Sequence, residues 1–231
     1  DDIDSLLNDA WTLCDMLTGD IKIQKYLRMD FDSIRDQYSN DLAGSMELAS
    51  ISTYRKDIFG VYVFGQNGGR YKSNYYSFKS EDQRETTWYK TIAGSRETTW
   101  FPSHEGSFIV RSSISDNFIT VGQPVMDKAS GMVNGIVAAD IKEDVITQRI
   151  KHSLSNGVIC IIDQEGSILF RSNAGNDLHY PIDISPSLVS HILESTGTAV
   201  GKSMVVPDSG YLVVSRTLRS EEHTSNSSHT K

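Results

Sequence analysis

The feature that most constrains the fold is a strand-and-turn pattern that occurs twice, once on each side of a short helix-like segment. Residues 131–140 combine a glycine turn, an apolar strand and a closing aspartate. Residues 157–171 combine an apolar strand, an Asp-x-x-Gly turn and a second strand, which predicts a hairpin. A chain that completes one small sheet and then begins another is predicted to contain two lobes in series.

The composition is that of a folded, acidic protein. Of the 231 residues, 38% are hydrophobic and 23% are charged, as in globular rather than disordered chains. The formal charge of -8 argues against nucleic acid as a partner, because phosphate binding needs a basic surface. No apolar run approaches the roughly 20 residues of a membrane span. The acidic start lacks the features of a signal peptide, so we expect it to lie within a mature or trimmed segment.

Residues 1–56 are predicted to form a long helical stalk. About 50 helical residues would extend roughly 75 Å, which exceeds the needs of one small lobe and suits a homodimer interface along the helix. A helical hairpin packed on the sheet is the alternative. A break is expected at Gly19-Asp20, and Asp30 is a candidate cap for the following helix. The apolar residues with helical spacing are Ile3, Leu6, Leu7, Ala10, Leu13 and Leu17 before the break, and Phe31, Ile34, Tyr38, Leu42 and Met46 after it.

From residue 58 the hydrophobic period changes to the alternation of strands. We predict a strand pair joined by a glycine-rich turn at 65–69, a helix at 81–93, and further strands that include one at 108–113. These elements form a first lobe at residues 57–141.

A connector helix at 142–156 is predicted to lead into a second, shorter lobe at 157–218. The predicted fold class is therefore α+β: a long N-terminal helix followed by two PAS-like lobes, each an antiparallel sheet flanked by helices. Residues 219–231 contain no hydrophobic residue and resemble a translated sequencing adapter, so we predict a non-native tail and a truncated second lobe. A natural flexible polar tail is the alternative.

Several motifs resemble double Cache sensor domains, which are extracytoplasmic parts of bacterial membrane receptors. They are Trp88-Tyr89-Lys90 on a helix, the strands at 119–125 and 135–141, and the hairpin turn from Asp163 to Gly166. The resemblance extends over the whole chain before the tail. It implies flanking transmembrane helices outside this chain and a cytoplasmic output, most often a histidine kinase and otherwise a chemoreceptor or a diguanylate cyclase.

The resemblance also implies a small-molecule ligand, such as an amino acid, in the membrane-distal first lobe. Trp88 and Tyr89 would line the pocket, and Asp140 would pair with a ligand ammonium. Amino-acid binders carry an arginine two residues before the tryptophan, where this chain has Thr86, and the nearest arginine is Arg84. This departure argues against an α-amino acid.

Arg111 could supply the missing cation, and Trp100 could add a further wall of the pocket. Each candidate also has a structural alternative. Trp88, Tyr89 and Trp100 could be core aromatics, Arg111 could face solvent, and Asp140 could cap the connector helix.

The sequence gives no indication of catalysis. It contains no nucleophile-elbow, zinc-protease, Walker or dinucleotide-binding fingerprint. The histidines before the tail, His104, His152, His179 and His191, do not have metal-ligand spacing. We therefore predict no catalytic residue, metal or cofactor in this fragment. The two competing functions are a ligand sensor and a ligand-free interaction module whose pocket is filled by its own side chains.

Overall fold

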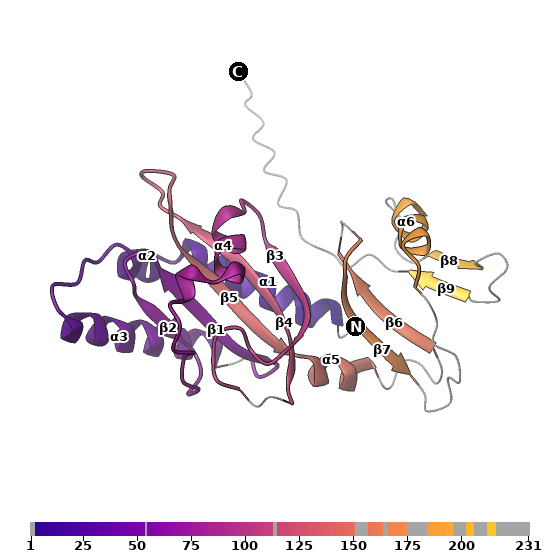
Figure 1. Cartoon of the computed structure of the whole chain (residues 1–231), viewed down its shortest axis with the longest axis horizontal. Coiled ribbons are helices and arrows are strands. Elements are labelled where there is room, and N and C mark those ends of the chain that lie inside the picture. The colour runs from indigo at the N-terminus through magenta and orange to yellow at the C-terminus, as the bar shows by residue number, and fades with distance from the viewer. Residues whose placement is uncertain are drawn as a thin grey trace, which may run out of the picture. The chain divides into compact units, whose positions relative to one another are not determined.

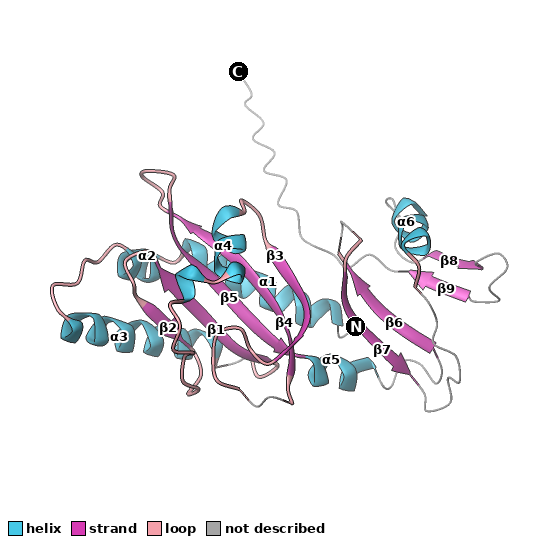
Figure 2. Ribbon diagram, in the orientation of Figure 1, coloured by secondary structure: helices cyan, strands magenta, loops and turns pink. Residues whose placement is uncertain are grey.

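The computed structural model describes residues 3–53, 55–112, 115–150, 157–163, 166–174, 184–195, 202–205 and 212–215. The chain divides into two compact units, Asp1–Ile182 and Asp183–Lys231. The architecture mixes helices with antiparallel sheet (Figure 1 and Figure 2), so the predicted α+β class is confirmed. The boundaries of the two predicted lobes stay predictions, and the tail at 219–231 lies outside the described residues.

A five-stranded antiparallel sheet forms the centre of the first unit, with the strand order β2-β1-β5-β4-β3. Nearly all residues of β1, β4 and β5 are buried, because helices and loops cover both faces of the sheet. The turn between β1 and β2 has the predicted chemistry, with Gly68 at a φ of 91°. The strands are β1 (Ile58–Gly65), β2 (Arg70–Lys72), β3 (Thr99–Glu105), β4 (Asn117–Met126) and β5 (Val133–Lys142).

The N-terminal segment forms three helices, α1 (Ile3–Gly19), α2 (Ile21–Leu27) and α3 (Ile34–Ser52), and two of them pack on one face of the sheet. Helix α1 contacts β4 and β5, and α3 contacts β1 and β2. Asp20 caps α2, whereas the cap of α3 is Ser33 rather than the expected Asp30. This arrangement corresponds to the alternative of a helical hairpin packed on the sheet. Helix α1 buries the predicted apolar side chains Leu6, Leu7, Ala10, Leu13 and Leu17, together with Cys14.

Helix α3 packs through a different face from the one its apolar residues predict. It contacts the sheet through Asn40, Gly44 and Leu48. A Cβ atom at Gly44 would lie 2.3 Å from the Tyr71 ring, so this glycine allows a close approach that a larger residue would prevent. Asn40 donates a 2.6 Å hydrogen bond to the Tyr71 hydroxyl. The predicted residues Ile34, Tyr38, Leu42 and Met46 are instead 88%, 70%, 53% and 67% exposed.

The opposite face of the sheet is covered by α4 (Thr87–Gly94) and by loops. The predicted continuous helix at 81–93 is interrupted, because a short 3₁₀ helix (Gln83–Glu85) ends at Thr86, which then caps α4. The predicted strand at 108–113 is absent from the described residues of that segment, where Val110 makes one isolated bridge to Phe78. The core on this side contains Tyr62, Phe64, Trp88, Tyr89, Ile92, Ile109, Val110, Ile136 and Ala138.

The first unit continues with α5 (Glu143–Ile150) and a hairpin of β6 (Gly157–Ile162) and β7 (Ile168–Ala174). The predicted Asp-x-x-Gly turn is confirmed, because Gly166 has a φ of 89° and Ser167 N donates to Asp163 Oδ1 at 2.8 Å. Residues 151–156 of the predicted connector lie outside the described part of the chain.

The second unit, considered by itself, contains α6 (Pro186–Ser195) and an antiparallel pair of β8 (Lys202–Val205) and β9 (Leu212–Ser215). These elements follow the order predicted for the end of the second lobe. In the described parts of the chain, no helix is long and apolar enough to span a membrane.

Candidate functional site

Asp140 is a fully buried carboxylate on β5, where three hydroxyl groups surround it. Its relative exposure is 0%. Ser107 Oγ donates to Asp140 Oδ2 at 2.6 Å, and Thr120 Oγ1 donates to Asp140 Oδ1 at 2.7 Å. The Tyr62 hydroxyl provides a third hydrogen bond. Asp140 therefore does not cap the connector helix, which begins at Glu143.

Burial raises the pKa of Asp140 from its ordinary value of 3.8 to about 6, because desolvation disfavours the charged form. The hydrogen bonds from Ser107, Thr120 and Tyr62 oppose this rise, and so does the positive charge of Lys79. A buried carboxylate whose pKa is raised by desolvation is a candidate for a functional site.

His104 extends this cluster through Thr120. Its Nε2 atom lies 3.0 Å from Thr120 Oγ1, its Nδ1 atom lies 2.9 Å from the carbonyl oxygen of Gly106, and its ring stacks on Phe108 with centroids 3.6 Å apart. Burial lowers the pKa of His104. The Gly106 carbonyl only accepts, so Nδ1 carries a hydrogen.

The hydrogen count then allows two arrangements with the same net charge. In the ionic one, His104 carries both ring hydrogens, Nε2 donates to Thr120, and Thr120 donates to the Asp140 carboxylate. In the neutral one, the Asp140 carboxylic acid donates to Thr120, and Thr120 donates to Nε2 of His104. The Thr120 hydroxyl therefore connects the Asp140 carboxyl group to the His104 imidazole.

Trp88 and Tyr89, the two predicted pocket aromatics, are buried on α4. The indole nitrogen Trp88 Nε1 and the hydroxyl of Tyr89 are both buried, and neither has a hydrogen-bond partner in the described residues. Buried polar atoms without partners are rare in folded proteins, and each calls for an explanation. The Trp88 ring stacks against Phe108, with centroids 6.5 Å apart, and Phe108 in turn stacks on His104. The indole therefore belongs to the aromatic cluster beside Asp140.

The predicted residue Trp100 lies on the other face of the sheet. It is paired with Val121, whereas its neighbour Phe101 is paired with Thr120, and Thr120 is paired with Asp140. Directly paired residues on adjacent strands share a face, and consecutive residues alternate between faces. Phe101 is therefore the β3 aromatic on the Asp140 face.

The predicted cation Arg111 is exposed, and its backbone N–H donates to the Ser77 carbonyl. The positive charge that acts on Asp140 and also on His104 comes instead from Lys79, which is half-buried. The loop sequence around Lys79 carries no periodic signal that would have identified it.

Neither Thr86 nor Arg84 reproduces the expected carboxylate clamp. The Thr86 hydroxyl accepts from the backbone N–H of Tyr89 as the cap of α4. Arg84 forms an ion pair with Asp82 at 2.7 Å and donates to the Gln66 carbonyl at 3.1 Å.

Arg84 and Tyr89, two residues already considered in the sequence, both line one pocket. It has a volume of about 550 Å³, within the range of small-molecule sites. Burial raises the pKa of Tyr89 to about 12, and the nearby charge of Arg84 opposes that rise. The lining residues, which do not include Asp140, are Gln66, Arg84, Glu85, Tyr89, Lys90, Ala93 and Gly94.

No protein-family model and no curated protein matches the sequence. Solved structures do match. The ligand-binding domain of the Campylobacter jejuni chemoreceptor Tlp3 in complex with 4-methylisoleucine is 17% identical over 88% of this chain and 77% of that chain, with a TM-score of 0.53. Its complex with L-valine is 16% identical over 91% and 81%, with a TM-score of 0.53. The sensory domain of Tlp3 in a further structure is 16% identical over 88% and 80%, with a TM-score of 0.52.

The chain has the fold of a chemoreceptor sensory domain. At these identities the similarity concerns the fold and does not transfer a ligand or a set of binding residues.

Proposed function

We propose that this chain is the extracytoplasmic ligand-sensing part of a bacterial transmembrane receptor, and that it binds a small molecule on the Asp140 face of the sheet. The observation that carries the proposal is the combination of a fully buried carboxylate at Asp140, held by hydroxyl groups, with two buried donors that have no partner among the described residues, Trp88 Nε1 and the Tyr89 hydroxyl. Burying a carboxylate or an unpartnered donor destabilises a fold, and a bound ligand would satisfy the two donors.

The chemistry of the site favours a ligand with both a donor and an acceptor. An ammonium or hydroxyl group would replace Ser107 or Thr120 at the Asp140 carboxylate. The donors on Trp88 and Tyr89 require an acceptor, such as a carboxylate or a carbonyl. An amino acid has both groups, although Thr86 supplies no cation for its carboxylate. Other small metabolites fit the same requirement.

In this proposal the site consists of Trp88, Tyr89 and Asp140 from the predicted set. Phe101 replaces Trp100 as the further aromatic wall of the site, and Lys79 replaces Arg111 as its positive charge. The receptor's output lies outside this chain. The resemblance to double Cache domains favours a histidine kinase, and a chemotaxis signalling domain fits the structural neighbours equally well, with a diguanylate cyclase as a further alternative.

A thermal-shift screen against amino acids, organic acids, polyamines, purines and sugars tests this proposal. A ligand at one hundred times its dissociation constant should stabilise the chain by about 2.7 kcal/mol. Asp140→Asn should abolish the shift, whereas the control Asp116→Asn, which removes an outer carboxylate paired with Lys142, should keep it. If every ligand that stabilises the wild type stabilises Asp140→Asn equally, the Asp140 face binds none of them and the proposal is contradicted.

A homodimer is a second proposal, and the exposed face of α3 favours it. Ile34, Tyr38, Leu42 and Met46 recur every four residues and form one ridge along the helix. Each neighbouring row contains two small residues beside two longer polar or charged ones. One row is Arg35, Ser39, Ala43 and Glu47, and the other is Gln37, Asp41, Ser45 and Ala49.

A second copy could therefore seat its own ridge in these grooves, with the two α3 helices crossing at about -50°. Sedimentation velocity should show a dimer that Leu42→Glu dissociates and that the control Met132→Glu, at an exposed apolar residue outside α3, leaves intact. A monomer at all concentrations tested, or a dimer unaffected by Leu42→Glu, would contradict this interface.

A further inference from the structure

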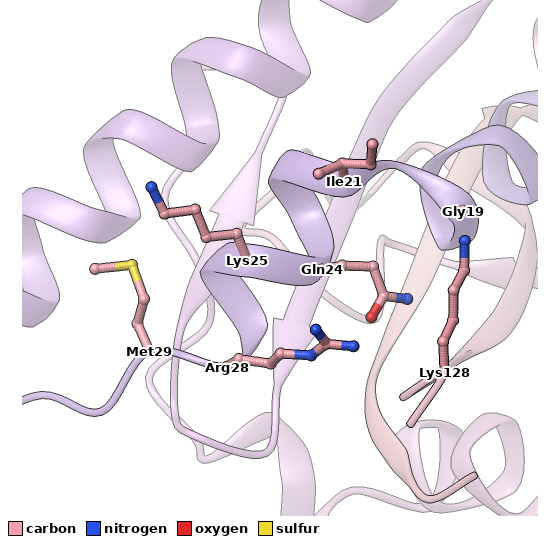
Figure 3. Close-up of a pocket in the computed structure, with 7 residues that line it drawn as sticks. All are labelled: Gly19, Ile21, Gln24, Lys25, Arg28, Met29 and Lys128. Carbon is pink, nitrogen blue, oxygen red and sulfur yellow. The ribbon is translucent and has the colours of Figure 1, made fainter. Parts of the chain in front are cut away.

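A separate pocket lies beside α2 and has a volume of about 420 Å³ (Figure 3). It is positively charged in a chain whose formal charge is -8, because three of its lining residues are cations and none of them is acidic. A concave basic site on an acidic protein concentrates small anions. The lining residues are Gly19, Ile21, Gln24, Lys25, Arg28, Met29 and Lys128.

Gln24 lines this pocket and has a buried, unused hydrogen-bond acceptor. Its relative exposure is 6%. The amide orientation is fixed, because Nε2 donates to the carbonyl oxygens of Thr18 at 2.8 Å and of Met126 at 3.1 Å. The other amide atom, Oε1, is buried and has no partner in the described part of the chain. A buried acceptor left in this state favours a ligand that brings a donor.

Two of the cations, Arg28 and Lys128, lie on either side of the Gln24 amide. Figure 3 shows the Gln24 amide between the guanidinium of Arg28 and the side chain of Lys128, whereas Lys25 points to the other side. Arg28 is held by Asp127, whose Oδ2 accepts from Arg28 Nε at 2.8 Å. Hydrogen bonds from backbone N–H groups keep the pKa of Asp127 well below its usual range, so this anchor stays ionised.

We propose that this pocket binds a small hydroxycarboxylate. Its carboxylate pairs with Arg28 and Lys128, and its hydroxyl donates to Gln24 Oε1. The three cations disfavour an ammonium donor, so the donor is a neutral hydroxyl. The planar guanidinium of Arg28 matches a carboxylate, and the carbon skeleton lies against the aliphatic side chain of Ile21.

Isothermal titration calorimetry of the whole chain with L-malate, succinate and inorganic phosphate tests the proposal. Malate and succinate have the same two carboxylates and differ by one hydroxyl. Since that hydroxyl satisfies a buried acceptor, malate is expected to bind about tenfold more tightly than succinate. Equal affinities for malate and succinate, binding of phosphate as tight as that of malate, or no malate binding at millimolar concentration would each overturn the proposal.

Two variants locate the site. Lys128→Gln should weaken malate binding about tenfold, whereas the control Lys56→Gln, an exposed lysine outside the pocket, should leave the affinity unchanged. Gln24→Met should remove the preference for malate over succinate. Gln24 also donates hydrogen bonds to two carbonyl oxygens, so Gln24→Met could disturb the fold. This variant is therefore interpreted only if its circular dichroism spectrum matches that of the wild type. If the spectra differ, Lys128→Gln alone tests the site. Malate binding that is insensitive to Lys128→Gln would overturn the assignment.

Discussion

The two faces of the central sheet are built on different principles. On the face that α1 and α3 cover, α1 buries apolar side chains from Leu6 to Leu17, and α3 buries Asn40, whose Oδ1 has no partner among the described residues. On the α4 face, the sheet buries the carboxylate of Asp140, and α4 buries two such polar atoms, on Trp88 and Tyr89. Both faces therefore bury unpartnered polar atoms, but among the described residues only the α4 face buries a carboxylate. A buried carboxylate lowers stability, which is expected where a protein retains binding capacity.

The largest expected effect is a loss of stability from a substitution on the α1 face. Leu13 is buried on α1 against the sheet, so Leu13→Ala should lower the free energy of unfolding by about 2–5 kcal/mol. Urea unfolding followed by circular dichroism measures this change. Ligand affinity at the Asp140 face should stay the same for the fraction that remains folded. A large loss of affinity would show that the two faces are not independent.

The next largest effect is a pH dependence of stability that arises from Asp140 on the α4 face. Because the pKa of Asp140 is about 6 in the folded chain and 3.8 when unperturbed, protonation favours the folded state. This contribution is fully present below the unfolded value and is lost as the pH rises through 6. As the pH falls from about 7.5 to about 4, the free energy of unfolding of the wild type should therefore rise by up to about 3 kcal/mol relative to that of Asp140→Asn.

Unfolding of both proteins across this range measures the difference, and the comparison is needed because other groups titrate too. His104 has a lowered pKa and acts in the opposite direction, and Lys79 and Tyr62 also face Asp140. If the free energies of unfolding of the two proteins differ by the same amount at every pH, the pKa of Asp140 is not raised in the folded chain.

Two neighbouring aromatics on β3 sharpen the comparison, because they point to opposite faces. Phe101→Ala should weaken binding of a ligand identified in the thermal-shift screen about tenfold, which corresponds to about 1.4 kcal/mol. Trp100→Ala should lower stability and leave the affinity unchanged. Calorimetric titration of both variants decides the point, and the reverse outcome would place the ligand on the α1 face.

The smallest expected effect concerns a single hydroxyl. Tyr89→Phe removes a buried donor without changing the shape of the ring, so it should raise the free energy of unfolding by about 1 kcal/mol. The same variant should weaken ligand binding. Denaturant unfolding and titration measure the two changes, and a loss of stability would show that the hydroxyl is already satisfied in the free protein.

Local signals predicted most of the strands and turns. Alternation from Ile58 and the glycine turn gave the β1–β2 hairpin, and the Asp163 turn gave the β6–β7 hairpin. The orientation of α3 could not be read in this way, because it depends on the contact of Gly44 and Asn40 with Tyr71, which is distant in sequence. An apolar stripe identifies a face that avoids water but does not identify what covers it.

The candidate site was predictable to a similar extent. Trp88, Tyr89 and Asp140 were predicted from the resemblance to double Cache sensor domains, and the structure buries all three on the α4 face. Thr120 could have been found from register alone, because a hairpin whose turn lies near residue 130 places it opposite Asp140. Lys79 and Ser107 lie in irregular segments, and no periodic pattern relates them to the strand they contact.

The hydroxyl of Thr120 has one further consequence. A hydroxyl has one hydrogen, so Thr120 can donate either to the Asp140 carboxylate or to Nε2 of His104, but not to both at once. Protonation of Asp140 therefore allows the Thr120 hydroxyl to turn toward His104. The orientation of this one hydroxyl thus reports the charge of the buried carboxyl group.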